Sequence, residues 1–202
     1  MNRMLLWTGL GSWRAEVSDV DLGEDRLSAT GTQLGVDPLP YRLDYTVQTG
    51  SRFVTNRLDV IASGPGWRRH LDLRRSGAGD WTGEIDKSGE VDLPDPGGNV
   101  SALAGAEDCD LGRCPLTNTM PVRRHNLHRE PGAVDFLMAW VSVPDLGVHP
   151  ARQRYEHLYT NPDGTAVVRY VGAHRGFVGE LVFDSDGLVV TYPELAQRVG
   201  GS

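Results

Sequence analysis

Apolar and polar residues alternate along much of the chain, which is the pattern of β-strands with one buried face. The clearest case is residues 41–47, where Tyr, Leu, Tyr and Val alternate with Arg, Asp and Thr. Residues 135–144 contain a run that is apolar on both faces, which predicts a central strand. Further strands are predicted at residues 53–61, 70–73, 81–85, 123–127, 152–159, 166–171, 177–183 and 188–192.

Turn sequences separate these strands, and helical periodicity is almost absent. Tight turns are favoured at residues 64–66, 77–80, 95–98, 161–164 and 184–187, all of which contain glycine beside proline, aspartate or alanine. Only residues 193–199 resemble a short helix, with proline in the first turn and glycines beyond it. The pattern predicts a single all-β domain over residues 1–202, a long meander that must curl or close to protect its edges.

Composition adds limits on partners and location. The chain has 202 residues, 39% hydrophobic and 23% charged, which is typical of soluble globular proteins. Its net charge of −7 disfavours nucleic acid and anionic lipid surfaces as partners. The apolar run near the N-terminus is too short for a secretory signal, and no window is long enough for a membrane span. We therefore expect a cytoplasmic protein without integral membrane insertion, in which Cys109 and Cys114 are free thiols.

The most informative stretch is residues 108–124, Asp-Cys-Asp-Leu-Gly-Arg-Cys-Pro-Leu-Thr-Asn-Thr-Met-Pro-Val-Arg-Arg. Its two prolines, Pro115 and Pro121, predict an extended or turned segment. Such a segment could hold a polar ligand, or it could be a buried hydrogen-bond network that fixes the β-structure. The side chains concerned are those of Asp108, Asp110, Thr117, Asn118, Arg123 and Arg124.

The same stretch resembles the signature of the bacterial putative glycolipid-binding family, Asp-x-Asp-Leu followed by Pro-x-Thr-Asn-Thr-Met-Pro-Val-Arg-Arg. Other pieces that fit are residues 41–45, 79–81, 153–155, 183–188 and 192–193, so the resemblance extends from about residue 16 to residue 199. It implies a strongly curved antiparallel sheet, an incomplete β-barrel similar to bacterial lipoprotein carriers. Cys114 departs from the pattern, because a small hydroxyl residue is expected before the proline.

If the sheet curls, polar residues on its inner face become candidate ligand contacts. Guanidinium groups suit sugar hydroxyls and phosphates, which makes Arg57, Arg123 and Arg124 candidates. Their alternative role is on the outer face, in ion pairs with aspartates. Among the tryptophans, Trp140 is expected in the core, whereas Trp81 adjoins a turn and is a candidate for the rim of a cavity.

Three further polar residues coincide with the family pattern: Glu16, Gln153 and Tyr155. Gln153 and Tyr155 would share one strand face and could join Asn118 in a polar set that lines the cavity. A purely structural hydrogen-bond network is an equally good interpretation of the same residues.

Asp108 and Asp110 lie two residues apart, so both would face the same way in an extended segment. A carboxylate pair can support acid–base chemistry or contact a metal ion. We favour hydrogen bonds from Arg123, Arg124 or backbone amides instead. The spacing of Cys109 and Cys114 matches common zinc sites poorly, and no metal or cofactor is predicted.

The leading hypothesis is a binding protein that holds an amphipathic small molecule, a glycolipid or a fatty acyl compound, in the concave face of the sheet. The alternative is an enzyme on the same scaffold that uses Asp108 or Asp110 as acid or base and Arg124 for charge stabilisation. A homodimer formed through an exposed sheet edge is a third possibility.

Overall fold

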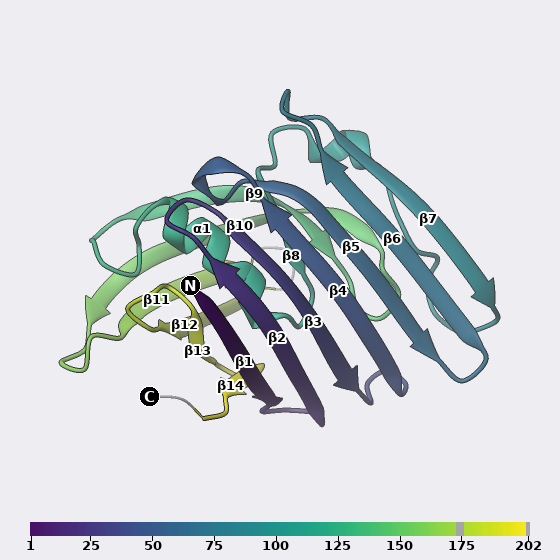
Figure 1. Cartoon of the computed structure of the whole chain (residues 1–202), viewed down its shortest axis with the longest axis horizontal. Coiled ribbons are helices and arrows are strands. Elements are labelled where there is room, and N and C mark those ends of the chain that lie inside the picture. Colours follow the sequence, from purple (N-terminus) through teal and green to yellow (C-terminus); the bar gives the residue numbers. More distant parts are fainter. Residues whose placement is uncertain (173–175, 201–202) are drawn as a thin grey trace.

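The structure, a computed structural model, describes residues 1–172 and 176–200. Within these residues one sheet holds 14 strands, in the order β7-β6-β5-β4-β3-β2-β1-β14-β13-β12-β11-β10-β9-β8 (Figure 1). Neighbouring strands are antiparallel except β8 and β9, which are parallel. The strands are β1 (Asn2–Gly9), β2 (Arg14–Leu22), β3 (Leu27–Gly35), β4 (Tyr41–Thr49), β5 (Thr55–Gly64), β6 (Trp67–Arg75), β7 (Trp81–Gly89), β8 (Asp108–Leu111), β9 (Ala133–Val141), β10 (Val148–Thr160), β11 (Ala166–Gly172), β12 (Phe177–Phe183), β13 (Val189–Tyr192) and β14 (Ala196–Arg198).

The sheet is strongly curved and does not close, because its edge strands β7 and β8 do not pair with each other. The predicted all-β fold with an incomplete barrel is confirmed, whereas a closed β-barrel is not formed. Figure 1 shows strands β1–β7 as a broad near layer, with β8–β12 behind it. The two parts of the sheet join where β1 pairs with β14. No helix of the described residues is long and apolar enough to cross a membrane.

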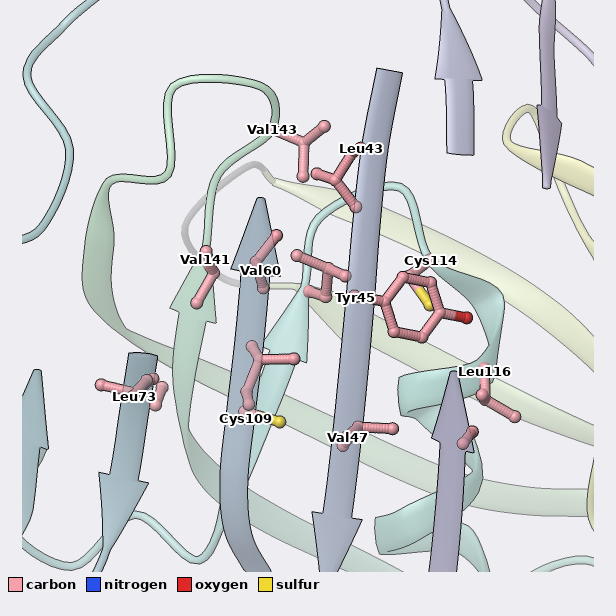
Figure 2. Packing of buried hydrophobic residues seen from close by; sticks show 14 of the residues in the cluster. Leu43, Tyr45, Val47, Val60, Leu73, Cys109, Cys114, Leu116, Val141 and Val143 are labelled. Atoms are coloured by element: carbon pink, nitrogen blue, oxygen red, sulfur yellow. The ribbon is translucent and has the colours of Figure 1, made fainter. Parts of the chain in front are cut away.

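The concave side is filled by the segment between β7 and β9. This segment contains the short 3-10 helices η2 (Val100–Leu103) and η3 (Pro115–Asn118) and the helix α1 (Thr119–Arg124); a further 3-10 helix, η1 (Ser51–Phe53), connects β4 and β5. Figure 2 shows Cys109, Cys114 and Leu116 of this segment lying against strands β4 and β5, in one apolar cluster with Leu43 and Val60. Most of the concavity is therefore protein core, and any ligand must use the space that remains.

Alternation along the strands explains the burial. In β4, Tyr41, Leu43, Tyr45 and Val47 are buried while Arg42 points outward. The Tyr45 ring lies across the neighbouring strand β3, over Gly31. The approach is so close that a Cβ at position 31 would stand 2.4 Å from the ring, and only glycine leaves the space. The glycine thus lets Tyr45 reach over β3 toward β2, where its hydroxyl finds Glu16.

Three secondary-structure predictions near prolines differ from the structure. Residues 123–127 are not a strand, because Arg123 and Arg124 end α1. Pro115 stands at the first position of η3 and Pro121 in the first turn of α1, where a missing N–H breaks no helical hydrogen bond. The extended or turned conformation expected of 108–124 is found in β8 and in the turn at residues 112–113, whereas residues 119–124 are helical. Residues 193–199 are not a helix, since Ala196–Arg198 is a strand paired with both β1 and β13.

Candidate functional site

A pocket of about 310 Å³ remains beside the filled concavity, between the β8–η3 segment and the strands β9 and β11–β13. Its walls combine two polar residues of the family stretch with several aromatic rings. The side chains that matter for its chemistry are Asp110, Asn118, Trp140, Tyr170, Phe177 and Tyr192. Exposed Glu194 and partly buried Arg113 are also among the lining residues, so the pocket opens to solvent near them.

Asp110 is held from two sides. Its Oδ1 accepts a hydrogen bond from the hydroxyl of Thr117 at 3.0 Å, and its Oδ2 accepts one from Nε2 of Gln153 at 2.6 Å. Thr117 lies in η3 and Gln153 on β10, so the carboxylate joins the inserted segment to the sheet. A buried acceptor fixed in this way is a preorganised partner for a hydroxyl donor of a ligand.

Asn118 and Tyr155 extend the same network. The hydroxyl of Tyr155 lies 2.7 Å from Oδ1 of Asn118 and 3.1 Å from Oε1 of Gln153. Since that hydroxyl has one proton, it donates to one of the two amides at a time. The Asn118 amide nitrogen makes only long contacts, 3.5 and 3.4 Å, to the carbonyls of Cys114 and Pro115. The structure thus brings together Asp110, Asn118, Gln153 and Tyr155, the first two of which line the pocket and the other two fix them.

Aromatic rings form the opposite walls. Tyr170 makes ring contacts with Tyr155, Phe177 and Tyr192, at centroid distances of 5.1, 6.0 and 5.8 Å. Trp140 also lines the pocket and is half-buried, so the expectation that it belongs to the core is wrong. Aromatic faces pack against the C–H surfaces of sugar rings and against acyl chains.

Glu16 lies in a second buried network, which meets the pocket lining at Cys114. One carboxylate oxygen accepts hydrogen bonds from the Tyr45 hydroxyl at 2.9 Å and the Cys114 thiol at 3.1 Å, and the other accepts from Gln33 at 3.0 Å. Burial raises the pKa of Glu16, and it also raises the pKa of the Cys114 thiol well above its usual value. Cys109 and Cys114 are both free and buried, as expected, and neither is an activated thiolate.

Asp108 and Arg124 form a salt bridge in which neither side chain has accessible surface. Burial raises the pKa of Asp108 to about 6, although the positive charge of Arg124 acts in the opposite direction. The expected hydrogen bond between these two residues is therefore present, and it is sealed from the pocket. A substrate would not reach either group, so the enzyme hypothesis keeps only Asp110 of its three candidate residues.

The remaining candidates lie outside the pocket lining. Arg123 donates a hydrogen bond to the carbonyl of Asp186 and stacks over the Phe53 ring. Arg57 is on the outer face, paired with Asp59 and Asp72. Trp81 is buried and donates its indole N–H to the carbonyl of Ala106 at 3.1 Å. It is not among the lining residues, so Trp81 does not form the rim of this pocket. Each of these three contacts is structural.

His128, just beyond α1, gives a testable pH dependence. It is buried, and burial together with Arg129 and Arg123 lowers its pKa to about 4. The unfolded chain then binds a proton more readily than the folded chain between pH 6.5 and 4, so stability contributed by neutral His128 is lost as the pH falls through that window. We expect His128→Gln to narrow the difference in unfolding free energy between pH 7 and pH 4.5, measured by urea denaturation. An unchanged pH profile would contradict a buried neutral imidazole.

Sequence reasoning missed the aromatic walls. Tyr170, Phe177 and Tyr192 sit in strands that were predicted, but their common position follows from the pairing of β11 with β12 and from the short strand β13, which one sequence does not reveal. A usable signal was present: aromatic residues recur in three successive C-terminal strands. Cys114, the departure from the family pattern, also proves to line the pocket.

The fold and site define an all-β protein with one open, strongly curved sheet and an aromatic pocket beside a buried polar network. The sequence model of the family described as putative glycolipid-binding matches residues 4–198, and the chain belongs to that family. Its fold is similar to the crystal structure of a DUF1089 family protein from Pseudomonas aeruginosa, with a TM-score of 0.68 and 26% identity. That similarity covers 94% of this chain and 92% of the other. A comparison with curated proteins found no match.

Proposed function

We propose that the protein binds the head group of a glycolipid, or of a similar amphipathic molecule, in the pocket between the β8–η3 segment and strands β11–β13. One observation carries the proposal: the pocket sets a buried carboxylate, Asp110, and a buried amide, Asn118, opposite a group of aromatic rings. Directional acceptors and donors beside aromatic faces suit a sugar, whose hydroxyls and C–H faces need both. The family description is consistent with such a ligand.

The size of the pocket limits what it holds. About 310 Å³ is at the lower end of small-molecule sites, which range from about 300 to 1,000 Å³. It suits a head group of one or two rings and not a complete lipid with its acyl chains. The buried salt bridge of Asp108 and Arg124 supports the walls without touching the ligand.

The test is a titration with a soluble alkyl glycoside below its micelle concentration, followed by calorimetry and by tryptophan fluorescence, since Trp140 lines the pocket. We expect Asp110→Asn to weaken binding about tenfold to hundredfold, the loss typical of a hydrogen bond to a charged group. Asp44→Asn is the matched control, because Asp44 pairs with Arg42 on the outer face. Its affinity should equal that of the unmodified protein.

Two results would contradict the proposal. One is an absence of binding across a panel of glycosides and glycolipids, with no lipid detected by native mass spectrometry after gentle purification. The other is binding that Asp110→Asn leaves unchanged while the melting temperature of the variant is also unchanged, which would place the ligand elsewhere.

A further inference from the structure

The turns at the two ends of strands β1–β6 differ in character. At one end the turns are residues 10–13, 36–40 and 65–66, which contain leucine, tryptophan, valine and three prolines; we call this the apolar end. The turns at the opposite end, residues 23–26, 50–54 and 76–80, contain glutamate, aspartate, arginine, serine and glycine, and of their two large apolar residues Phe53 is buried and Val54 partly buried. Figure 1 shows the hairpin turns of the apolar end lying side by side along one margin of the sheet.

Large apolar side chains at this end are exposed. Trp13 is 60% exposed, and Leu10, Val36 and Leu34 are 51%, 45% and 40% exposed. Trp13, Leu34 and Val36, with two prolines of the turns, line a shallow groove of about 420 Å³. Soluble proteins seldom gather exposed apolar residues in this way without a partner, and tryptophan is favoured where an apolar phase meets water.

The apolar end is joined to the rim of the ligand pocket. Arg113 lines the pocket and binds the β3–β4 turn through the carbonyl and carboxylate of Asp37, at 2.7 and 2.8 Å. Leu195, also in the lining, accepts hydrogen bonds at its carbonyl from the amide of Leu10 at 3.2 Å and from Arg14 at 2.9 Å. The pocket therefore opens beside the exposed apolar turns.

Charge indicates the kind of surface that fits. The ionisable residues of the turns, the groove and the adjoining rim are Arg14, Asp37, Arg42, Arg113 and Glu194, and the positive charge of Arg42 is paired with Asp44. Arg14 is buried and Arg113 is paired with Asp37. With a net charge of −7, the whole chain is repelled by an anionic surface, whereas this end is electrically neutral.

We propose that the apolar end docks on an uncharged lipid surface, so that a lipid head group enters the pocket while its acyl chains stay in the bilayer. This inference rests on the proposed function, and it accounts for a pocket of only about 310 Å³. Trp13 and the neighbouring turns would insert at the depth of the lipid head groups, where an indole is most favourable.

The test is flotation of the full chain with three kinds of vesicle: phosphatidylcholine alone, phosphatidylcholine with a neutral glycolipid, and phosphatidylcholine with phosphatidylglycerol. We expect the protein to float with the first two kinds of vesicle, and we expect phosphatidylglycerol not to increase the bound fraction. The double variant Trp13→Ser, Val36→Ser should lower the partition coefficient about tenfold, because two exposed apolar side chains no longer enter the interface. Val178→Ser is the control, since Val178 is 61% exposed on β12, outside the apolar end.

The outcomes separate docking from ligand binding. If the double variant loses vesicle binding and still binds the soluble alkyl glycoside, both proposals stand. If the protein does not bind neutral vesicles, or binds them equally well after the double substitution, the docking inference is overturned. The glycoside titration tests the pocket separately. Binding only to anionic vesicles would also overturn it. So would light scattering that shows a dimer which the double variant converts to a monomer, since a second copy would then cover this end.

Discussion

Arg124→Met should destabilise the protein by about 3–5 kcal/mol, the usual cost of removing one partner of a buried ion pair. Arg124 and Asp108 have no accessible side-chain surface, so the substitution leaves a carboxylate buried without its countercharge. The measurement is the free energy of unfolding in urea at pH 7.5, above the pKa of about 6 that burial gives Asp108. Arg154→Met is the matched control, because Arg154 and its partner Asp135 are both largely exposed, and it should cost under about 1 kcal/mol.

The penalty should depend on pH in a defined direction. Without Arg124 the folded-state pKa of Asp108 rises further, so the folded chain binds a proton more readily than the unfolded chain over a wider range. Stability of the variant therefore falls as the pH rises through this range, and its deficit should shrink on acidification to pH 5. A deficit that is constant with pH would show that lost packing, for example against the Phe136 ring, outweighs the charge.

The double variant Asp108→Val, Arg124→Met separates charge from shape. Several buried atoms of this pair, Oδ1 of Asp108 and Nε of Arg124 among them, have no hydrogen-bond partner within the described residues. Replacing both groups by apolar ones removes that cost, so most of the lost stability should return. If the double variant is as unstable as Arg124→Met, the attraction within the salt bridge stabilises the fold by more than the desolvation of the two groups costs.

The sequence predicts strands well where burial follows hydropathy. Residues 41–47 alternate clearly, residues 177–183 are largely apolar, and both are strands in the structure. The first three strands were not predicted at all. In β2 the buried face carries Arg14, Glu16 and Ser18, while Val17 points to solvent. In the first half of this strand the polar residues are therefore buried and an apolar residue is exposed, the reverse of the usual pattern. A strand that buries a polar network cannot be recognised by alternation of apolar residues.

The site could be predicted only in part for a related reason. Gln153 and Tyr155 were expected to join Asn118, and Asp110 was a separate candidate; hydrogen bonds connect all four in the structure. Asp108 was also a candidate ligand contact, with a hydrogen bond from Arg124 as the favoured alternative, and it is this alternative that the structure has. Both aspartates sit on one short strand with similar neighbours in sequence. What separates them is the path of η3 and α1, set by how the prolines begin each helix and not visible in the pattern alone.

Glu16→Ala should cost about 3–5 kcal/mol, an effect comparable with that of Arg124→Met. The carboxylate accepts hydrogen bonds from Tyr45, Gln33 and Cys114, all of them buried. Removing it takes the acceptor from these three donors and from the Ser18 hydroxyl, each at about 1–3 kcal/mol, partly offset by the hydrogen bond between Tyr45 and Ser18, by rearrangement or by water. Thermal and urea unfolding would measure the loss, with Glu84→Ala on the exposed strand β7 as a control expected to change stability by under about 0.5 kcal/mol.

Glu16→Gln distinguishes a hydrogen-bond role from a role of the charge. The Oε1 of Gln33 has no partner within the described residues, so a flip of the Gln33 amide lets it accept a hydrogen bond from the introduced amide. Burial raises the pKa of Glu16, which means that the charged form destabilises the fold as the pH rises above the unfolded value near 4.5. Glu16→Gln should therefore lower the free energy of unfolding only slightly at pH 5. As the pH rises to 8, the variant should become more stable relative to the unmodified protein. If it loses stability over that range instead, the negative charge itself is required, with buried Arg14 as its partner.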